Sequence, residues 1–336
     1  MEHMRIVAPA DRSKRVLDLL LENPSVCNVV FLEGVARRPE GDVILCDVAR
    51  EDTSVVISDL KELDIHEDGS IALELIDTQL SKFAHRAEAN AHGAAADAVV
   101  WEEVEERSSE NVELSGVFVI FMVLAAFIAA VGIFLNSPIL IVGAMVVGPE
   151  FGPIAGLCVA LVQRRKDMAV RSAVALTTGF PLAITSVFLL VLVFKATNLV
   201  PGDFDDKDHN LSSVIASPDF FAFFVAACAG AAGMLSLSTA KSGALIGVLI
   251  SVTTIPAAAN VGISAAYADW AAWRGSLAQL GINLGSILLA GTLTLLVQRM
   301  LYRRRRLQHL RDPSRSVAGL PVGRSRRSRS EVGAKS

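Results

Sequence analysis

An apolar stretch interrupted by prolines, residues 136–153, constrains the fold more than any other feature of this sequence. It reads NSPILIVGAMVVGPEFGP, with prolines at positions 138, 149 and 153 and one carboxylate, Glu150. Proline lacks a backbone N–H and clashes with the carbonyl four residues back, so a continuous helix disfavours it. Backbone groups that are freed inside a bilayer must find partners in the protein or in water. The stretch is therefore predicted to be a broken membrane helix that faces other helices or a cavity.

Apolar segments of membrane-spanning length recur along the chain. The 336 residues are 52% hydrophobic, which is too apolar for an ordinary soluble protein. A helix needs roughly 20 residues to cross the hydrocarbon core. Six segments reach that length, at about 115–135, 138–162, 170–195, 219–238, 243–264 and 277–301. The sequence thus predicts an α-helical polytopic membrane protein of about six spans, with residues 115–301 as its transmembrane domain.

Charge is distributed unevenly and predicts an orientation. Residues 1–114 hold 25 acidic and 11 basic side chains, whereas residues 115–336 hold 10 acidic and 20 basic ones. The basic connections after the second, fourth and sixth segments fall on one side, and the acidic loop 202–208 falls on the other. The positive-inside rule then places both termini in the cytoplasm of a multi-pass cell-membrane protein, such as one of the bacterial inner membrane. The first residues show no signal-peptide pattern, in keeping with a cytosolic start.

The N-terminal region, residues 1–80, alternates strand and helix patterns. Strands are predicted at 5–8, 26–32, 42–49 and 70–77, and helices at 11–22 and 53–63. The order β-α-β-β-α-β is that of a ferredoxin-like, α+β domain. Because a fold does not define a function, two interpretations remain: a structural or dimerising domain, and a ligand-sensing regulatory domain.

Two polar segments flank the transmembrane domain. Residues 81–114 are rich in Ala and Glu and are predicted to be a helical acidic linker. Residues 302–336 are basic and Ser-rich, and are predicted to be a disordered cytosolic tail against anionic lipid headgroups. No fold in the sequence supports nucleic-acid binding by this tail.

The predicted spans contain a weak internal sequence similarity. Six spans with both ends on one side divide into two sets of three, so two equivalent halves would have inverted topology. Residues 141–157 and 245–263 both run through an apolar, Gly-containing half and then reach Pro and small residues. Paired broken helices of this kind indicate a transport site near the midplane. The alternative is that these Gly and Pro residues serve helix packing alone.

These blocks resemble a known family of bacterial and archaeal membrane proteins. The matching residues are GIFLNSP at 132–138 with IVGAM at 141–145, then GALIGV at 243–248, Pro256, Val261-Gly262 and Asn283. They are similar to the signatures of the domain of unknown function 389 family, also labelled the uncharacterised hydrophobic domain family, over about residues 115–300. The resemblance implies the fold, the topology and a membrane location, but no activity. The chain has Gly-Pro-Glu-Phe-Gly-Pro at 148–153 where the family usually has Ser-Pro-Leu-Met-Gly-Pro, and Ile255-Pro256 where it has Pro-Pro.

Glu150 is the sharpest candidate for a substrate- or ion-binding residue. A carboxylate at membrane depth is costly and by default indicates a functional site. It could carry a proton or coordinate a cation; the alternative is a solvated position at the membrane edge. Neutral polar groups and the helix breaks around them are predicted to complete the site: Asn136, Ser137, Pro149, Pro153, Ser251, Thr253, Thr254, Pro256, Asn260 and Asn283.

The function predicted from these features is that of a transporter or channel for a small solute or ion, with a cytosolic regulatory domain. The alternative is a non-transporting, membrane-anchored sensor or scaffold that binds a ligand or partner through residues 1–80. An enzyme is not predicted, because all six histidines lie outside the spans and no Ser-His-Asp set, HExxH or P-loop occurs. The expected partners are the lipid bilayer, a small ligand and further copies of the chain. No catalytic residue, metal site or particular cofactor is indicated.

Overall fold

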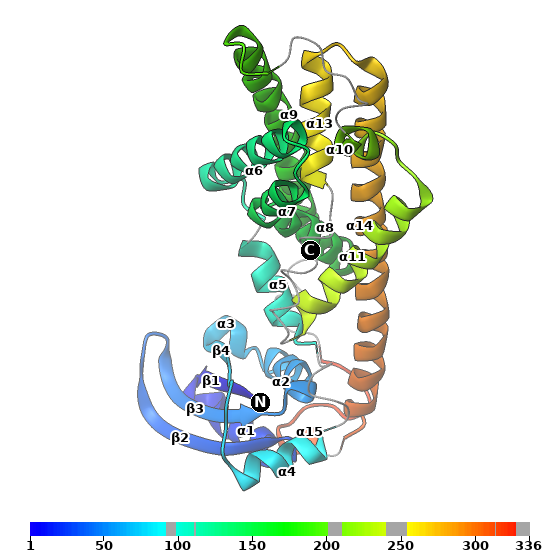
Figure 1. The fold of residues 1–336 in the computed structure, drawn as a ribbon. Helices are drawn as coiled ribbons and strands as arrows, with labels where there is room; N and C mark the ends of the chain where they lie inside the picture. The colour runs from blue at the N-terminus through cyan, green and yellow to red at the C-terminus, as the bar shows by residue number, and fades with distance from the viewer. Residues whose placement is uncertain (92–98, 111, 201–209, 240–253, 313, 327–336) are drawn as a thin grey trace. The chain divides into compact units, whose positions relative to one another are not determined.

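The computed structural model describes residues 1–91, 99–110, 112–200, 210–239, 254–312 and 314–326 (Figure 1). The chain divides into two compact units. Unit 1 comprises Met1–Glu102 and Gln298–Ser336, and unit 2 comprises Glu103–Val297. The division thus separates a small antiparallel sheet from the apolar helices.

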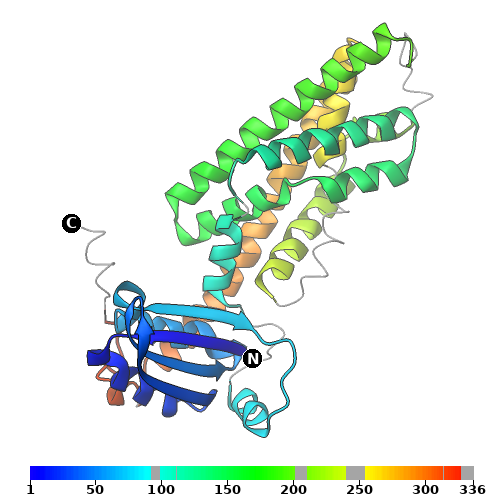
Figure 2. The same cartoon turned by 90° about the vertical axis from the view of Figure 1, so that its left-hand side faces the viewer.

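Unit 1 is built on a four-stranded antiparallel sheet, shown in Figure 2. Its strands are β1 (Glu2–Ala8), β2 (Val26–Arg37), β3 (Glu40–Val48) and β4 (Ser70–Leu75), in the order β2-β3-β1-β4. The helices α1 (Ala10–Leu21) and α2 (Arg50–Glu62) connect them, and a short α3 (Ile65–Asp68) precedes β4. The predicted β-α-β-β-α-β order is therefore confirmed, with a strand order that matches the split βαβ arrangement.

The core of unit 1 follows from the alternation of side chains along the strands. On β1, Met4 and Ile6 are fully buried while Arg5 between them is exposed. The buried face packs against apolar residues of the two long helices, such as Leu20 of α1 and Leu60 of α2. The hairpin of β2 and β3 extends to the pair Arg37 and Glu40, so β2 runs five residues beyond its predicted end.

The C-terminal segment is part of the same core. Helix α14 (Trp270–His309) ends in unit 1 and is followed by α15 (Ser314–Val317). Ala318 and Leu320 join the core cluster of the sheet, and Arg315 is fully buried. The prediction of a disordered tail is thus wrong for residues 302–312 and 314–326. Its basic composition obscured both the two apolar side chains and the acidic partners that lie about 250 residues earlier.

The segment between the sheet and the apolar helices contains two described helices. Helix α4 covers Lys82–Asn90 and α5 covers Trp101–Glu110. Residues 92–98 of the predicted linker lie outside the described residues.

Unit 2 consists of apolar helices. They are α6 (Gly116–Phe134), α7 (Pro138–Val147), α8 (Phe151–Gln163), α9 (Lys166–Ala196), α10 (Asn210–Ile215), α11 (Phe220–Ser238), α13 (Thr254–Ala266) and most of α14. Four of them, α6, α9, α11 and α14, are long and apolar enough to cross a membrane, and α7 with α8 forms a fifth candidate span that is bent by 52°. Length and composition therefore support a multi-pass membrane protein. The fifth predicted span, 243–264, is described only from residue 254 on, so six spans and inverted halves stay predictions.

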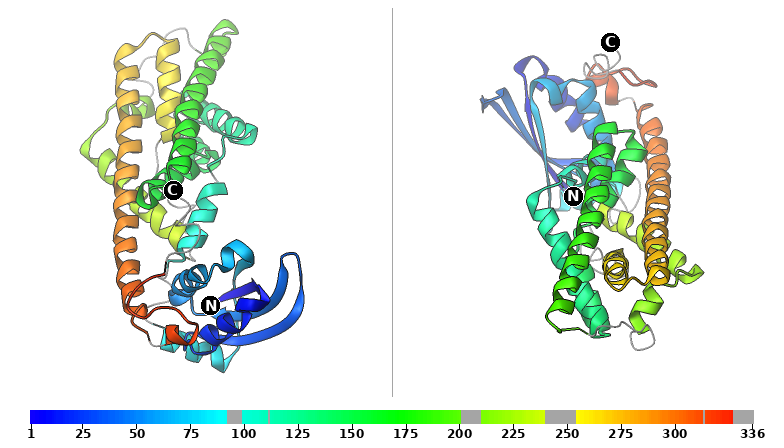
Figure 3. Two further views of the ribbon diagram at one scale, coloured as in Figure 1. Left: turned by 180° about the vertical axis from the view of Figure 1, so that it is seen from behind. Right: turned by 90° about the horizontal axis from the view of Figure 1, so that it is seen from above.

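Small residues let the helices of unit 2 approach closely. A Cβ at Gly230 of α11 would lie 2.6 Å from the carbonyl oxygen of Ile287 on α14, and one at Gly262 of α13 would lie 2.7 Å from that of Ile184 on α9. Such backbone approach is the usual basis of helix association in membranes. Helices α13 and α14 lie side by side (Figures 1 and 3), and a hydrogen bond between Asn260 and Ser276 joins them.

Candidate functional site

The predicted helix break lies at residues 148–150, between α7 and α8. Pro138 occupies the first turn of α7, where proline is well tolerated. Gly148 adopts an extended backbone conformation (φ −64°, ψ 129°), as a residue before proline prefers. The two helices then diverge by 52°. The break predicted at Pro149 is therefore confirmed, whereas Pro153 lies in the first turn of α8 and interrupts nothing.

Glu150 lies at this break with its carboxylate inside the protein. The side chain is 3% exposed. Its Oε1 accepts a hydrogen bond of 2.8 Å from the Thr254 hydroxyl of α13, while its Oε2 has no hydrogen-bond partner among the described residues. A Cβ at Gly148 would overlap Oε2, so the glycine makes room for the carboxylate. The solvated alternative for Glu150 is not supported by this burial.

In the part of the chain that the structure describes, no charged group neutralises a negative charge on Glu150. No basic side chain of the described residues forms an ion pair with it, and Thr254 is a neutral donor. A buried carboxylate without a cation is costly, because the desolvation of the charge is not offset. The position can relieve that cost by taking up a proton or a cation, and both are the chemistry of a coupled transport site.

Asn260 belongs to a separate hydrogen-bond network. Its side chain is fully buried and donates to the hydroxyl of Ser276 at 2.8 Å and to the carbonyl of Ser212 at 3.3 Å. Its Oδ1 accepts from the Ser212 hydroxyl at 2.9 Å. Asn260 thereby ties α10, α13 and α14 together, and its polar atoms are used by the protein. This geometry favours the packing role of an intramembrane amide over ligand binding.

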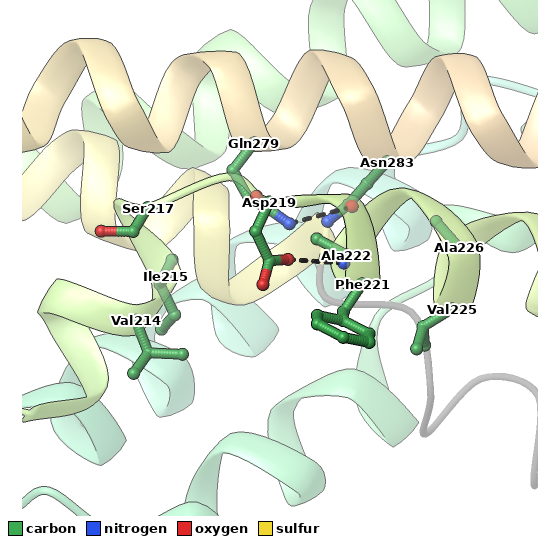
Figure 4. Close-up of a pocket in the computed structure, with 10 residues that line it drawn as sticks. All are labelled: Val214, Ile215, Ser217, Asp219, Phe221, Ala222, Val225, Ala226, Gln279 and Asn283. Carbon is green, nitrogen blue, oxygen red and sulfur yellow. Dashed lines mark hydrogen bonds between the residues drawn. The ribbon is translucent and has the colours of Figure 1, made fainter.

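Asn283 lies on a polar stripe of α14. Ser276, Gln279, Asn283 and Ser286 are all buried, and their spacing places them on one helix face. Gln279 donates from Nε2 to Asn283 Oδ1 at 3.1 Å. Both amides line a cavity in unit 2 (Figure 4). Gln279 was not predicted from the sequence, although its spacing from Asn283 could have indicated it.

Of the remaining predicted residues, Asn136 and Ser137 are not brought to Glu150. Asn136, in a left-handed conformation with φ 48°, accepts a hydrogen bond from the backbone N–H of Leu211, and Ser137 precedes α7. The ten residues of α7 separate them from the break by about 15 Å of helix. Pro256 is buried in the first described turn of α13. Ser251 and Thr253 lie outside the described residues.

A second charged cluster, in unit 1, was not predicted. Asp59 and Glu62 of α2 are 1% and 4% exposed. Asp59 pairs with Arg306 and Arg315 and contacts His309 Nε2 at 2.7 Å, and Glu62 accepts from Arg306, and from Arg315 Nη2 at 2.7 Å. Burial by itself would raise the pKa of Asp59, but the hydrogen bond with His309 and the charges of the three basic groups lower it.

The fold and the site together define a class: multi-helix membrane proteins with a broken span and a buried carboxylate. Residues 145–289 match the family model described as "Domain of unknown function (DUF389)", which confirms the resemblance over this segment and covers the break and Glu150. The block at residues 132–138 lies before the matched region.

A curated relative is the uncharacterised protein MJ0678 of Methanocaldococcus jannaschii. It is 24% identical over 165 residues, which are 49% of this chain and 49% of the relative. The chain therefore spans about half the length of the curated relative it matches. No solved structure matches the chain.

Proposed function

We propose that this multi-pass membrane protein transports an ion or a small solute, with Glu150 as the ionisable group of its transport site. The observation that carries the proposal is the carboxylate at the α7–α8 break, which is 3% exposed and has one oxygen without a hydrogen-bond partner among the described residues. Ionisable groups inside membrane domains mark ion and proton pathways. Discontinuous helices form the binding sites of many transporters.

The elements around Glu150 fit a site of this kind. The break frees backbone carbonyls at the end of α7, and Thr254 contributes a hydroxyl from α13. Oxygen ligands of these types suit a proton or a hard cation. The six predicted spans would form two inverted halves in a cell membrane, with both termini in the cytoplasm. The two broken segments, 141–157 and 245–263, would then occupy equivalent positions in the two halves. Unit 1 would then be the regulatory domain.

The test is flux through the purified full-length protein in liposomes, with a pH-sensitive dye inside and an imposed gradient of protons, Na⁺ or K⁺. We expect Glu150→Gln to lower flux to the level of protein-free vesicles, because the amide neither takes up a proton nor attracts a cation. The matched control is Glu113→Gln, the same change at an exposed side chain. A folded Glu150→Gln protein with unchanged flux and pH profile would exclude this role.

A second candidate function, that of a non-transporting sensor, is favoured by a polar pocket in unit 1. The pocket has a volume of about 430 Å³ and includes Asn23, Ser25, Arg305 and Arg311. The lining also holds the carboxylates of Asp52 and Asp312, so the two guanidinium groups can pair with an anionic group of a ligand while the acids can pair with a cationic one. A thermal shift with inorganic phosphate that is lost in Arg305→Gln and Arg311→Gln, in a protein without flux, would make this function the stronger one.

A further inference from the structure

A cavity of about 470 Å³ lies in unit 2, where α10 and the start of α11 meet α14 (Figure 4). Its volume is in the range of small-molecule sites. Most of its lining is apolar, and it is formed by Val214, Ile215, Ser217, Asp219, Phe221, Ala222, Val225, Ala226, Gln279 and Asn283. An apolar cavity with a few polar groups is the usual composition of a binding site for a small organic molecule.

One buried polar atom of the cavity lining is evidence for a ligand. Gln279 is 5% exposed, and its Oε1 has no hydrogen-bond partner among the described residues. Its Nε2 is used, since it donates to Asn283 Oδ1 at 3.1 Å. A desolvated amide oxygen without a donor is unfavourable, and buried polar atoms in proteins are nearly always paired. The oxygen has almost no accessible surface in this structure, so a bound molecule would supply an N–H or O–H donor to it with a rotation of the Gln279 side chain.

The charge of the lining restricts the ligand further. Asp219 is an exposed lining residue at the start of α11, where its Oδ1 caps the helix by accepting from Ala222 N at 2.8 Å. No Lys or Arg is among the lining residues of this cavity. Besides the Ser217 hydroxyl and the Asn283 amide, the lining therefore presents one carboxylate and one amide oxygen, both acceptors, beside an aromatic ring, Phe221. This combination favours a cationic donor over an anion.

We propose that this cavity binds a small amphipathic amine. Its ammonium group donates to Gln279 Oε1 and is attracted by the Asp219 carboxylate, while its apolar body packs against Ile215, Phe221 and Val225. The site is distinct from Glu150, and its occupancy does not depend on flux. Binding and transport can therefore fail independently.

The experiment is saturation binding of radiolabelled phenethylamine to the purified full-length protein, with ethylbenzene and 2-phenylethanol as unlabelled competitors. We expect saturable binding of the amine, weaker competition by the alcohol and almost none by the hydrocarbon. Gln279→Leu should weaken amine binding by about tenfold, as expected for the loss of a charge-assisted hydrogen bond. Gln163→Leu, the same change outside the lining residues, should bind as the wild type does.

Asp219→Asn tests the charge while it keeps the fold, because Asn caps a helix about as well as Asp. We expect it to weaken amine binding and to leave competition by 2-phenylethanol unchanged. The proposal is overturned if no saturable amine binding occurs, if ethylbenzene competes as well as the amine, or if a folded Gln279→Leu or Asp219→Asn protein binds phenethylamine like the wild type. A thermal midpoint measured for each variant confirms that it is folded.

Discussion

Asp59 in unit 1 and Glu150 in unit 2 are carboxylates of nearly equal burial, 1% and 3% exposed, in opposite surroundings. Asp59 is held by Arg306, His309 and Arg315. Among the described residues, the side chain that donates to the Glu150 carboxylate is that of the neutral Thr254. Burial alone therefore does not tell a carboxylate held by cations from one held by a neutral donor; the partners do.

The difference has a physical meaning. A buried charge whose partners are complete is fixed in one state, and the loss of a partner destabilises the fold. A buried carboxylate without a cationic partner carries the desolvation cost of its charge unless it takes up a proton or a cation. The first arrangement joins the C-terminal segment to the sheet domain, and the second lies at a broken span.

The largest effect is expected when the compensated cluster loses a cation. Arg315→Met should destabilise unit 1 by about 3–5 kcal/mol, because it leaves Asp59 and Glu62 buried with fewer partners. Hydrogen exchange of the β1 amides under mild denaturant measures unit 1 separately from the membrane helices. Arg311→Met, at an exposed position, is the control. Equal protection of the β1 amides in Arg315→Met and Arg311→Met would show that the buried ion pairs of Arg315 contribute nothing to the stability of unit 1.

A smaller effect is expected at the uncompensated carboxylate. Thr254→Val should destabilise unit 2 by about 1–3 kcal/mol, because it removes the hydrogen-bond donor of a buried acceptor. Replacing both partners by apolar groups is much less costly, so Glu150→Met with Thr254→Val should be close to the wild type. The measurement is the thermal midpoint of both variants in detergent. If the double variant lost as much stability as the sum of Thr254→Val and Glu150→Met alone, the two side chains would not be coupled.

The comparison also predicts a pH dependence for unit 1. The pKa of Asp59 is lowered in the folded state, so its contribution to stability is complete above the unfolded pKa of about 3.9 and is lost as the pH falls through the folded pKa. The protection of β1 amides should therefore fall below about pH 4, by less than Arg315→Met costs. In Asp59→Asn the pH dependence of β1 protection should become weaker. An unchanged pH dependence would show that other acidic groups cause it.

The smallest effect is expected at an exposed pair. Arg165 contacts Glu105 and Asp167, and its side chain is 49% exposed. Solvent screening leaves such pairs with little net energy, so Arg165→Gln should change the stability of unit 2 by about 0–1 kcal/mol. If Arg165→Gln lowered the thermal midpoint as far as Thr254→Val does, burial and partner type would not rank the contributions of these pairs to stability.

Local patterns accounted for much of the fold. Alternation and helical periodicity predicted the order of elements in residues 1–80. The apolar runs predicted six spans, of which four correspond to helices long enough to cross a membrane and one to the bent pair. The same patterns failed for Pro153, because a proline tolerated in a first helical turn looks the same in sequence as one that ends a helix. They also failed for the C-terminal segment, where two apolar core residues, Ala318 and Leu320, lie in a basic stretch.

The sequence by itself determined the break at Pro149 and the presence of a carboxylate beside it, since both follow from covalent structure and composition. Only the tertiary structure decided that Thr254 meets Glu150, that Asn260 bonds with Ser212 and Ser276, and that one oxygen of Gln279 has no partner among the described residues. The reason is that hydrogen bonds between distant residues depend on how the helices pack. One helix turn or one close glycine contact changes which side chains face each other, and no local pattern records that choice.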